Sequence, residues 1–218
     1  TETKYCKPSL LPHNELKLYG QGDKQDMAVD NHILDTTEKR SDLLQRYRDG
    51  AICVPFETVA EYNQDKNREI FKHSLVYIFH DVIDKTGHDG NAKQVTQACR
   101  EAIAELGTMI PKIHASYNVT EVYVTSDHGF LFNDIVFAEK DKHKIEEETL
   151  ERSSRYYLTT SNKEVNGIIK FPLDEVSAMV NVGDVFVAVP QGTNRLAAPS
   201  GGYMFTHGGA AMQEIIIP

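Results

Sequence analysis

One stretch of nine residues constrains the fold more than any other part of the 218-residue chain. It runs from Val122 to Phe130 and reads Val-Tyr-Val-Thr-Ser-Asp-His-Gly-Phe. The β-branched and aromatic residues of its first half are typical of a buried parallel strand, and α/β folds place ligand-binding side chains at the carboxyl ends of such strands. The stretch therefore predicts a strand with Asp127 and His128 at its tip. An alternative stays open, because Asp-His-Gly is also an ordinary strand-ending turn.

Two other apolar runs end in the same kind of side chain. The run Leu75–Phe79 is followed by histidines and acidic residues, among them Asp84 and His88. Far downstream, the run Tyr203–Phe205 leads within two residues to His207 and two glycines. Three separated strand ends thus offer carboxylate or imidazole groups, which are the ligands of divalent transition metals.

The order of these motifs resembles the metal-ligand signature of the alkaline phosphatase superfamily, which is Asp-x-x-x-His, then Asp-His-Gly, then His-Gly. More narrowly, the chain resembles a PglZ domain of the type found in BREX phage-exclusion systems. The resemblance spans nearly the whole chain and depends on four motifs in a fixed order, which are Leu10–His13, Tyr77–Asp84, Val124–Leu131 and Thr206–Gly209.

The resemblance implies two divalent metal ions. Asp84, His88 and His207 would hold one of them, and Asp127 and His128 would hold the other. Carboxylate oxygen mixed with imidazole suits zinc, and manganese is admissible. The superfamily's second metal also takes an Asp from a strand that precedes the nucleophile, and this chain has no such segment.

The ligand shell around Asp84 has open alternatives. PglZ sequences do not always keep a histidine in the place of His88, and Asp89 is the neighbouring candidate for that position. His80 and Asp81 are candidates for supporting the ligands, since a ligating imidazole usually donates its other nitrogen to a carboxylate or a carbonyl.

The resemblance also implies a hydroxyl nucleophile. Thr3 stands at the family's distance ahead of Leu10–His13, so Thr3 would be the attacking residue, with Thr1 as a nearby competitor. A surface threonine at a frayed terminus is the alternative, because only the resemblance distinguishes Thr3. Arg195 lies in the loop before His207, where it could meet a phosphate, although we expect a solvent-facing side chain.

Composition limits where the protein acts and on what. The net charge of −9 argues against a broad surface for nucleic-acid backbones, since such surfaces depend on Lys and Arg. The three cysteines have no Cys-x-x-Cys spacing, which indicates a reducing cytoplasm, with Cys53 and Cys99 as buried core residues. No apolar run approaches the roughly 20 residues that span a bilayer, so we expect no membrane association.

Periodicity and breaker residues predict the remaining elements. We expect a helix over Asn91–Tyr117, with a break or kink at Pro111. This helix would connect two parallel strands, Leu75–Phe79 and one near Glu121. Val95, Cys99, Ala102, Ile103 and Leu106 would form its apolar face. The other predicted elements are a hairpin over Glu15–Asp30, a helix over Glu38–Arg48, a strand at Ile52–Val54, helical sequence over Phe56–Lys72, a solvated charged segment over Asn133–Arg152, and strands within Arg155–Thr159, Gly167–Phe171 and Val185–Pro190.

These expectations combine into one interpretation. Residues 1–218 would form a single α/β domain, a three-layer sandwich with a mainly parallel sheet and an alkaline-phosphatase-like core that lacks its first strands. The chain would be a piece of a longer protein, since it begins without Met and ends in the strand-like Ile215–Pro218. It would be the C-terminal portion of such a domain, because the Asp-bearing segment ahead of the nucleophile is absent. Its function would be metal-dependent hydrolysis of a phosphate ester, with nucleotides or nucleic acids among the candidate substrates and other BREX proteins as partners. The alternative function is a non-catalytic interaction module of the defence complex with a degenerate metal site.

Overall fold

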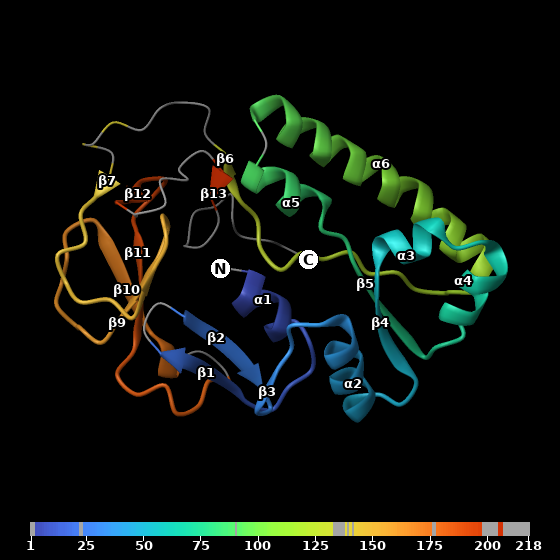
Figure 1. Ribbon diagram of the computed structural model, residues 1–218, viewed down its shortest axis with the longest axis horizontal. Coiled ribbons are helices and arrows are strands. Elements are labelled where there is room, and N and C mark those ends of the chain that lie inside the picture. Colours follow the sequence, from blue (N-terminus) through green and yellow to red (C-terminus); the bar gives the residue numbers. More distant parts are fainter. Residues whose placement is uncertain are drawn as a thin grey trace. The chain divides into compact units, whose positions relative to one another are not determined.

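The computed structural model describes residues 3–21, 24–89, 91–132, 138, 140, 142–175, 178–197 and 205–206, and at residues 21, 24, 88, 89 and 92 it describes only the backbone. The chain divides into two compact units (Figure 1). The first is Leu34–Val124, and the second consists of Thr1–Ile33 together with Thr125–Pro218. The first unit is therefore inserted in sequence between the two segments of the second.

The unit Leu34–Val124 begins with helix α2 (Thr37–Tyr47) and a parallel strand pair. Thr36 caps α2 by accepting a hydrogen bond from the backbone nitrogen of Lys39. Strand β4 (Ala51–Pro55) then pairs with β5 (Leu75–Phe79) in parallel register. Two short helices make the crossover between these strands, and they are α3 (Phe56–Glu61) and α4 (Gln64–Ile70).

Helix α6 (Ala92–Tyr117) is the longest element of this unit. Asn91 begins it with a complete capping box, in which Asn91 and Gln94 each bond the other's backbone. Of the predicted break or kink at Pro111, the break does not occur, because the helix continues through that residue. Pro111 forfeits one backbone hydrogen bond, but Met109 and Ile113 on either side are buried in the core and hold the helix against β4 and α3.

The apolar face of α6 differs at one residue from the prediction. Val95 and Ala102 are buried as expected, whereas Ile103 is 71% exposed. The buried face instead continues through Ala98, which is one helical turn from Ala102. Before α6 lies the short helix α5 (Val82–Asp89), which directly follows β5.

The predicted strand over residues 122–130 is not present. Residues 118–130 have no regular secondary structure, and Figure 1 draws them as a plain trace between α6 and β6 (Leu131–Phe132). Val122 packs against the core of its unit, but Tyr123 is 84% exposed and Val124 is 55% exposed. With one side uncovered, the segment lacks the two-sided burial that the prediction required, and the parallel partner of β5 is β4 instead.

The second unit starts with helix α1 (Thr3–Ser9) and a three-stranded antiparallel sheet in the order β1-β2-β3. The predicted hairpin over Glu15–Asp30 is confirmed as β1 (Leu16–Gln21) and β2 (Lys24–Val29). Asp30 and Asn31 both have positive φ and form the two-residue turn into β3 (His32–Ile33).

A four-stranded antiparallel sheet in the order β10-β11-β9-β8 forms the other part of this unit. Its strands confirm the three runs predicted there, and Tyr157, Ala188 and Leu196 form its core. The strands are β8 (Glu151–Arg152), β9 (Tyr157–Thr159), β10 (Ile168–Pro172) and β11 (Phe186–Pro190), and a 3₁₀ turn, Leu173–Glu175, follows β10. Two further strand pairs are present. Strand β7 (Lys142–His143) pairs with β12 (Arg195–Leu196) in parallel orientation. Strand β6 pairs with β13 (Phe205–Thr206) in antiparallel orientation.

The protein is thus a mixed α/β protein. The described residues do not confirm a three-layer arrangement or a mainly parallel sheet, because β4–β5 and β7–β12 are parallel and their other strand pairings are antiparallel. Among the helices of these residues, none combines the length and the apolar character needed to cross a membrane.

Candidate functional site

Thr3 and His128 lie side by side in the second unit. Thr3 is the first residue of α1, and its hydroxyl oxygen Oγ1 lies 3.0 Å from Nε2 of His128. The two residues are 125 positions apart in sequence, so this contact is made by the tertiary fold alone. It is the contact that a hydroxyl nucleophile and an accepting imidazole require.

The orientation of the His128 ring follows from its second nitrogen. Nδ1 lies 2.9 Å from the carbonyl oxygen of Gly129, and a carbonyl oxygen can only accept a hydrogen bond, so Nδ1 carries the hydrogen. In the neutral ring, Nε2 then carries the accepting lone pair, which faces Thr3. A ring that donates one nitrogen to a backbone carbonyl while the other stays an acceptor is also the state of a metal-ligating histidine.

Asp127 contributes its two carboxylate oxygens in different ways. Oδ1 accepts a hydrogen bond of 3.1 Å from the backbone nitrogen of His128, and Oδ2 lies 3.7 Å from Nε2 of the same residue. The Ser126 hydroxyl donates a hydrogen bond of 2.7 Å to the carbonyl oxygen of His128 and closes the turn. The turn that the sequence offered as an alternative is therefore present, and it leaves Oδ2 on the side of the imidazole nitrogen.

The donor groups of these three side chains are of the kind that bind divalent metal ions. Two ligands of a tetrahedral zinc ion with bonds of about 2.0 Å lie roughly 3.3 Å apart. The distances from His128 Nε2 to Thr3 Oγ1 and to Asp127 Oδ2 are 3.0 Å and 3.7 Å, which bracket that separation. Carboxylate, imidazole and hydroxyl donors together suit zinc or manganese.

Asp84 and His88 belong to the other unit, Leu34–Val124, and lie on α5 instead of at a strand tip. Their spacing of four residues places both on one side of that helix, one turn apart. The side chain of His88 falls outside what the structure describes, as does that of Asp89. His207 also lies outside the described residues.

His80 and Asp81 each have a defined partner. Nε2 of His80 lies 2.7 Å from Oε2 of Glu105, and its ring packs against Phe56 with a centroid distance of 4.6 Å. Asp81 lies 4.0 Å from the ammonium group of Lys85. The role of these two residues in supporting metal ligands stays a prediction.

The expectation that Arg195 faces solvent is wrong. Its side chain is 1% exposed, and its guanidinium group donates to the carbonyl oxygen of Thr193 at 2.5 Å. Arg155, which the sequence did not single out, is also fully buried and donates to the carbonyl oxygens of Gly192 and Asn194. The two buried guanidinium groups thus find acceptors in the backbone carbonyls of residues 192–194, a turn whose own residues are exposed. Nothing in the local sequence around Arg155 signals this role.

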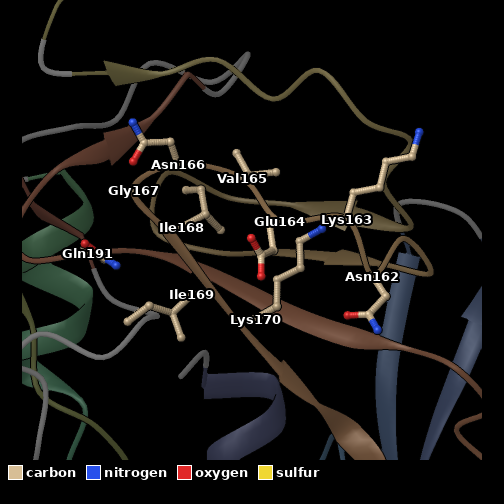
Figure 2. Close-up of a pocket in the computed structure, with 10 residues that line it drawn as sticks. All are labelled: Asn162, Lys163, Glu164, Val165, Asn166, Gly167, Ile168, Ile169, Lys170 and Gln191. Carbon is tan, nitrogen blue, oxygen red and sulfur yellow. The ribbon is translucent and has the colours of Figure 1, made fainter.

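A pocket of about 660 Å³ lies elsewhere in the second unit (Figure 2). Its lining consists of residues 162–170, which form the turn before β10 and its first half, together with Gln191. One carboxylate, Glu164, and no histidine is present in that lining, and Lys170 is bound to Glu147. The pocket therefore contains none of the predicted site residues.

Within the described part of the chain, no three His, Cys, Asp or Glu side chains gather closely enough to hold a metal ion by themselves. The cluster there has two such side chains, Asp127 and His128, with the Thr3 hydroxyl beside them.

The fold places the protein in the class of mixed α/β proteins, and this fold is consistent with an alkaline-phosphatase-like domain. The family profile described as "BREX system PglZ alkaline phosphatase-like domain" matches residues 1–218, and the chain belongs to this PglZ family. It is 25% identical over 213 residues to the "Alkaline phosphatase-like protein PglZ" of Bacillus cereus strain H3081.97, covering 96% of this chain and 24% of that protein. It is 27% identical over 228 residues to the "Alkaline phosphatase-like protein BrxZ" of Escherichia coli O9:H4 strain HS, covering 99% of this chain and 25% of that protein.

The chain thus spans about a quarter of the length of these relatives. No solved structure matches it significantly. The family assignment confirms the resemblance that the four motifs indicate, and the relatives' names associate the domain with BREX systems.

Proposed function

We propose that this domain hydrolyses phosphate esters and that Thr3 is its nucleophile. The observation that carries the proposal is the 3.0 Å contact between Thr3 Oγ1 and His128 Nε2, in a ring whose other nitrogen is held by the Gly129 carbonyl. A threonine hydroxyl is a weak nucleophile by itself and needs a group beside it that takes or replaces its proton. The family assignment supports the reaction class, since alkaline-phosphatase-like enzymes transfer phosphoryl groups to such a hydroxyl.

The reaction has two displacements. In the first, Thr3 gives its hydroxyl proton to water as Oγ1 attacks phosphorus, the bond from phosphorus to the ester oxygen breaks, and the leaving alkoxide takes a proton from water in exchange. In the second, water attacks the phosphothreonine, which releases phosphate or a phosphate monoester and restores the Thr3 hydroxyl. Asp127 and His128 orient the hydroxyl and keep acceptor atoms on its side throughout.

Asp127 and His128 would hold one divalent metal ion, and Asp84, His88 and His207 would hold a second. Zinc or manganese bound there would supply positive charge for the attacking and the leaving oxygens. His128 is suited to its part because its Nε2 lone pair and Asp127 Oδ2 lie on the same side, at a separation of 3.7 Å.

The substrate and the partners are proposals for the whole protein, of which relatives have about four times this length. We propose a phosphodiester or phosphomonoester substrate, with nucleotides or nucleic acids among the candidates. We further propose that the protein works in the cytoplasm with other BREX components in defence against phage.

The proposal is tested with Thr3→Ala and Thr3→Ser in the purified full-length protein, supplied with zinc or manganese. Bis(4-nitrophenyl) phosphate serves as the diester and 4-nitrophenyl phosphate as the monoester. We expect Thr3→Ala to lose hydrolysis by at least about 100-fold and Thr3→Ser to keep it, because serine retains the hydroxyl. Mass spectrometry of quenched reactions should find phosphate on Thr3.

Hydrolysis that survives in Thr3→Ala would refute the nucleophile. A protein that hydrolyses neither probe, carries no metal and still binds other BREX proteins would instead support the non-catalytic interaction module.

A further inference from the structure

A buried carboxylate is hydrogen-bonded to the helix that carries Thr3. Glu151, the first residue of β8, is 5% exposed. Its Oε2 atom accepts hydrogen bonds of 2.8 Å from the ammonium group of Lys4 and of 2.8 Å from the hydroxyl of Tyr5. Lys4 and Tyr5 follow Thr3 directly in α1, so Glu151 binds the two residues next to the candidate nucleophile.

Three further contacts make this attachment rigid. The other oxygen of Glu151, Oε1, accepts a short hydrogen bond from the Tyr156 hydroxyl. Lys4 also donates to the carbonyl oxygen of Gln25 at 2.8 Å, which ties α1 to β2, and the Tyr5 and Tyr156 rings meet edge to face at 6.4 Å. Charge-assisted hydrogen bonds to a buried carboxylate are strong and geometrically restrictive, so α1 has little freedom to turn or slide.

We propose that Glu151 is a positioning residue for Thr3. Through Lys4 and Tyr5 it fixes the start of α1, which keeps Thr3 Oγ1 within hydrogen-bonding distance of His128 Nε2. This inference deepens the proposed function and depends on it, because the held atom is the proposed nucleophile. A displacement of about 1 Å at a reacting atom is enough to reduce the rate roughly 100-fold.

The protein contains a matched control for this role. Glu147 also accepts hydrogen bonds from a tyrosine and a lysine, which are Tyr157 at 2.5 Å and Lys170 at 2.8 Å. Its partners lie on β9 and β10, away from α1 in the chain. Glu147→Gln therefore disturbs a similar group of tyrosine, lysine and glutamate without touching the helix that carries Thr3.

The test uses a reporter that does not need hydrolysis. Thr3→Cys is introduced into the full-length protein, and the alkylation rate of the introduced thiol by iodoacetamide at pH 7 is followed by peptide mass spectrometry with a metal chelator present. A thiol beside an accepting imidazole reacts faster than a free thiol, because the thiolate is the reactive form. The buried Cys53 thiol is an internal reference for folding, since it should stay slow while the protein is folded.

Adding Glu151→Gln to Thr3→Cys should slow the alkylation of the introduced thiol by about tenfold, to the rate of a thiol without an imidazole partner. Adding Glu147→Gln should leave the rate unchanged, and adding His128→Asn should slow it as Glu151→Gln does. On substrate, Glu151→Gln with Thr3 intact should lower kcat and leave KM unchanged, and an unchanged slow alkylation of Cys53 in the same variant excludes a loss of folded protein as the cause.

Equal alkylation rates with and without Glu151→Gln would overturn the proposal, as would an equal slowing by Glu147→Gln. A rate that His128→Asn does not change would contradict the Thr3–His128 contact itself, and with it the proposed function. If Glu151→Gln does not fold, Tyr5→Phe removes one of its hydrogen bonds and keeps the ring. Tyr5→Phe should then slow the alkylation of the introduced thiol by a smaller factor, and an unchanged rate would overturn the proposal.

Discussion

The hydroxyl oxygen of Thr3 lies 3.0 Å from Nε2 of His128, although 125 positions separate the two residues. Asp127 stands next to His128 in sequence and turns one carboxylate oxygen toward the same nitrogen. A hydroxyl, an imidazole and a carboxylate thus meet in one unit of the protein, and metal binding is the property that we expect this cluster to control.

Metal binding should depend on Asp127 and His128. Asp127→Asn and His128→Asn remove a carboxylate charge and an imidazole lone pair, so each should lower the affinity for zinc by about 10–100-fold or more. The measurement is elemental analysis of the purified full-length protein after dialysis against a defined zinc buffer.

His13→Asn is the control for this experiment. His13 lies in the same unit, and its Nδ1 is bound to the carbonyl oxygen of Leu11 at 2.7 Å, so its loss should leave the zinc content unchanged. Zinc retained at full stoichiometry by both Asp127→Asn and His128→Asn would show that the metal is held elsewhere.

Gly167 should be intolerant of any side chain. Its φ is +76°, and a Cβ atom there would lie 2.6 Å from Cε1 of His143. Gly167→Ala should lower the free energy of unfolding by about 1–2 kcal/mol for the left-handed backbone and by roughly a further 1–3 kcal/mol for the clash. Denaturant unfolding measures this change.

Gly192→Ala is the matched control, since Gly192 has a φ of +62° but no atom of the described residues within 4 Å of the place that a Cβ atom would take. Its free energy of unfolding should fall only by the contribution of the left-handed backbone, about 1–2 kcal/mol. Equal losses in the two variants would show that the His143 ring moves aside at little cost.

Cys53 should make stability fall in alkaline solution. Burial raises the pKa of its thiol from 9.0 to about 11, although a hydrogen bond with Ser41 opposes the shift. Because the folded pKa is the higher one, the stabilisation is complete below pH 9.0 and is lost as the pH rises toward 11. Between about pH 8 and about pH 10.5 the loss should be about 2 kcal/mol.

The comparison that isolates this effect is Cys53→Ala, which removes the titrating group. Its free energy of unfolding should fall less over the same pH interval than that of the parent protein. Parallel pH profiles for the two proteins would contradict the raised pKa. Cys53 is buried as the sequence predicts, whereas Cys99 is only half-buried.

Asn67 should be essential to the short helices between β4 and β5. It is fully buried, and its side-chain nitrogen donates to the carbonyl oxygens of Val59 at 2.8 Å and Tyr62 at 3.1 Å. Asn67→Ala would leave these carbonyls without that donor, so stability should fall by about 1–3 kcal/mol.

Asp65→Asn is a control on the same helix, because it removes only an exposed ion pair of 3.4 Å with Arg68. Its effect on the free energy of unfolding should be within about 0.5 kcal/mol. An Asn67→Ala variant as stable as Asp65→Asn would mean that water or a shifted side chain replaces the lost donor.

The sequence correctly predicted the elements whose formation depends on interactions between residues close together in the chain. The capped, amphipathic helix α6 and the apolar strand β5 were found within one or two residues, because capping and periodicity operate over a few positions. The segment at residues 122–130 was predicted wrongly, since a β-branched run becomes a strand only where a neighbouring strand supplies hydrogen bonds. The burial of Arg195 was missed for the same kind of reason, because it depends on packing against residues distant in sequence, which a local pattern does not reveal.

The residues of the candidate site could be predicted from the sequence, but their arrangement in space could not. Motif order singled out Thr3, Asp127 and His128, and the structure brings these three together, which leaves their chemistry as a proposal. The sequence held no sign that Glu151 would bind Lys4 and Tyr5, since 147 and 146 positions separate it from these two residues.

The insertion of Leu34–Val124 between the two segments of the second unit has a consequence for protein synthesis. Thr3 leaves the ribosome 125 residues before His128. At a synthesis rate of about 5–20 residues per second, roughly 6–25 s pass between the synthesis of Thr3 and that of His128. The inserted unit is complete at Val124, four positions before His128, so it can fold before the second segment closes the other unit. The contact between Thr3 and His128 therefore forms late in translation, once the second segment has been made.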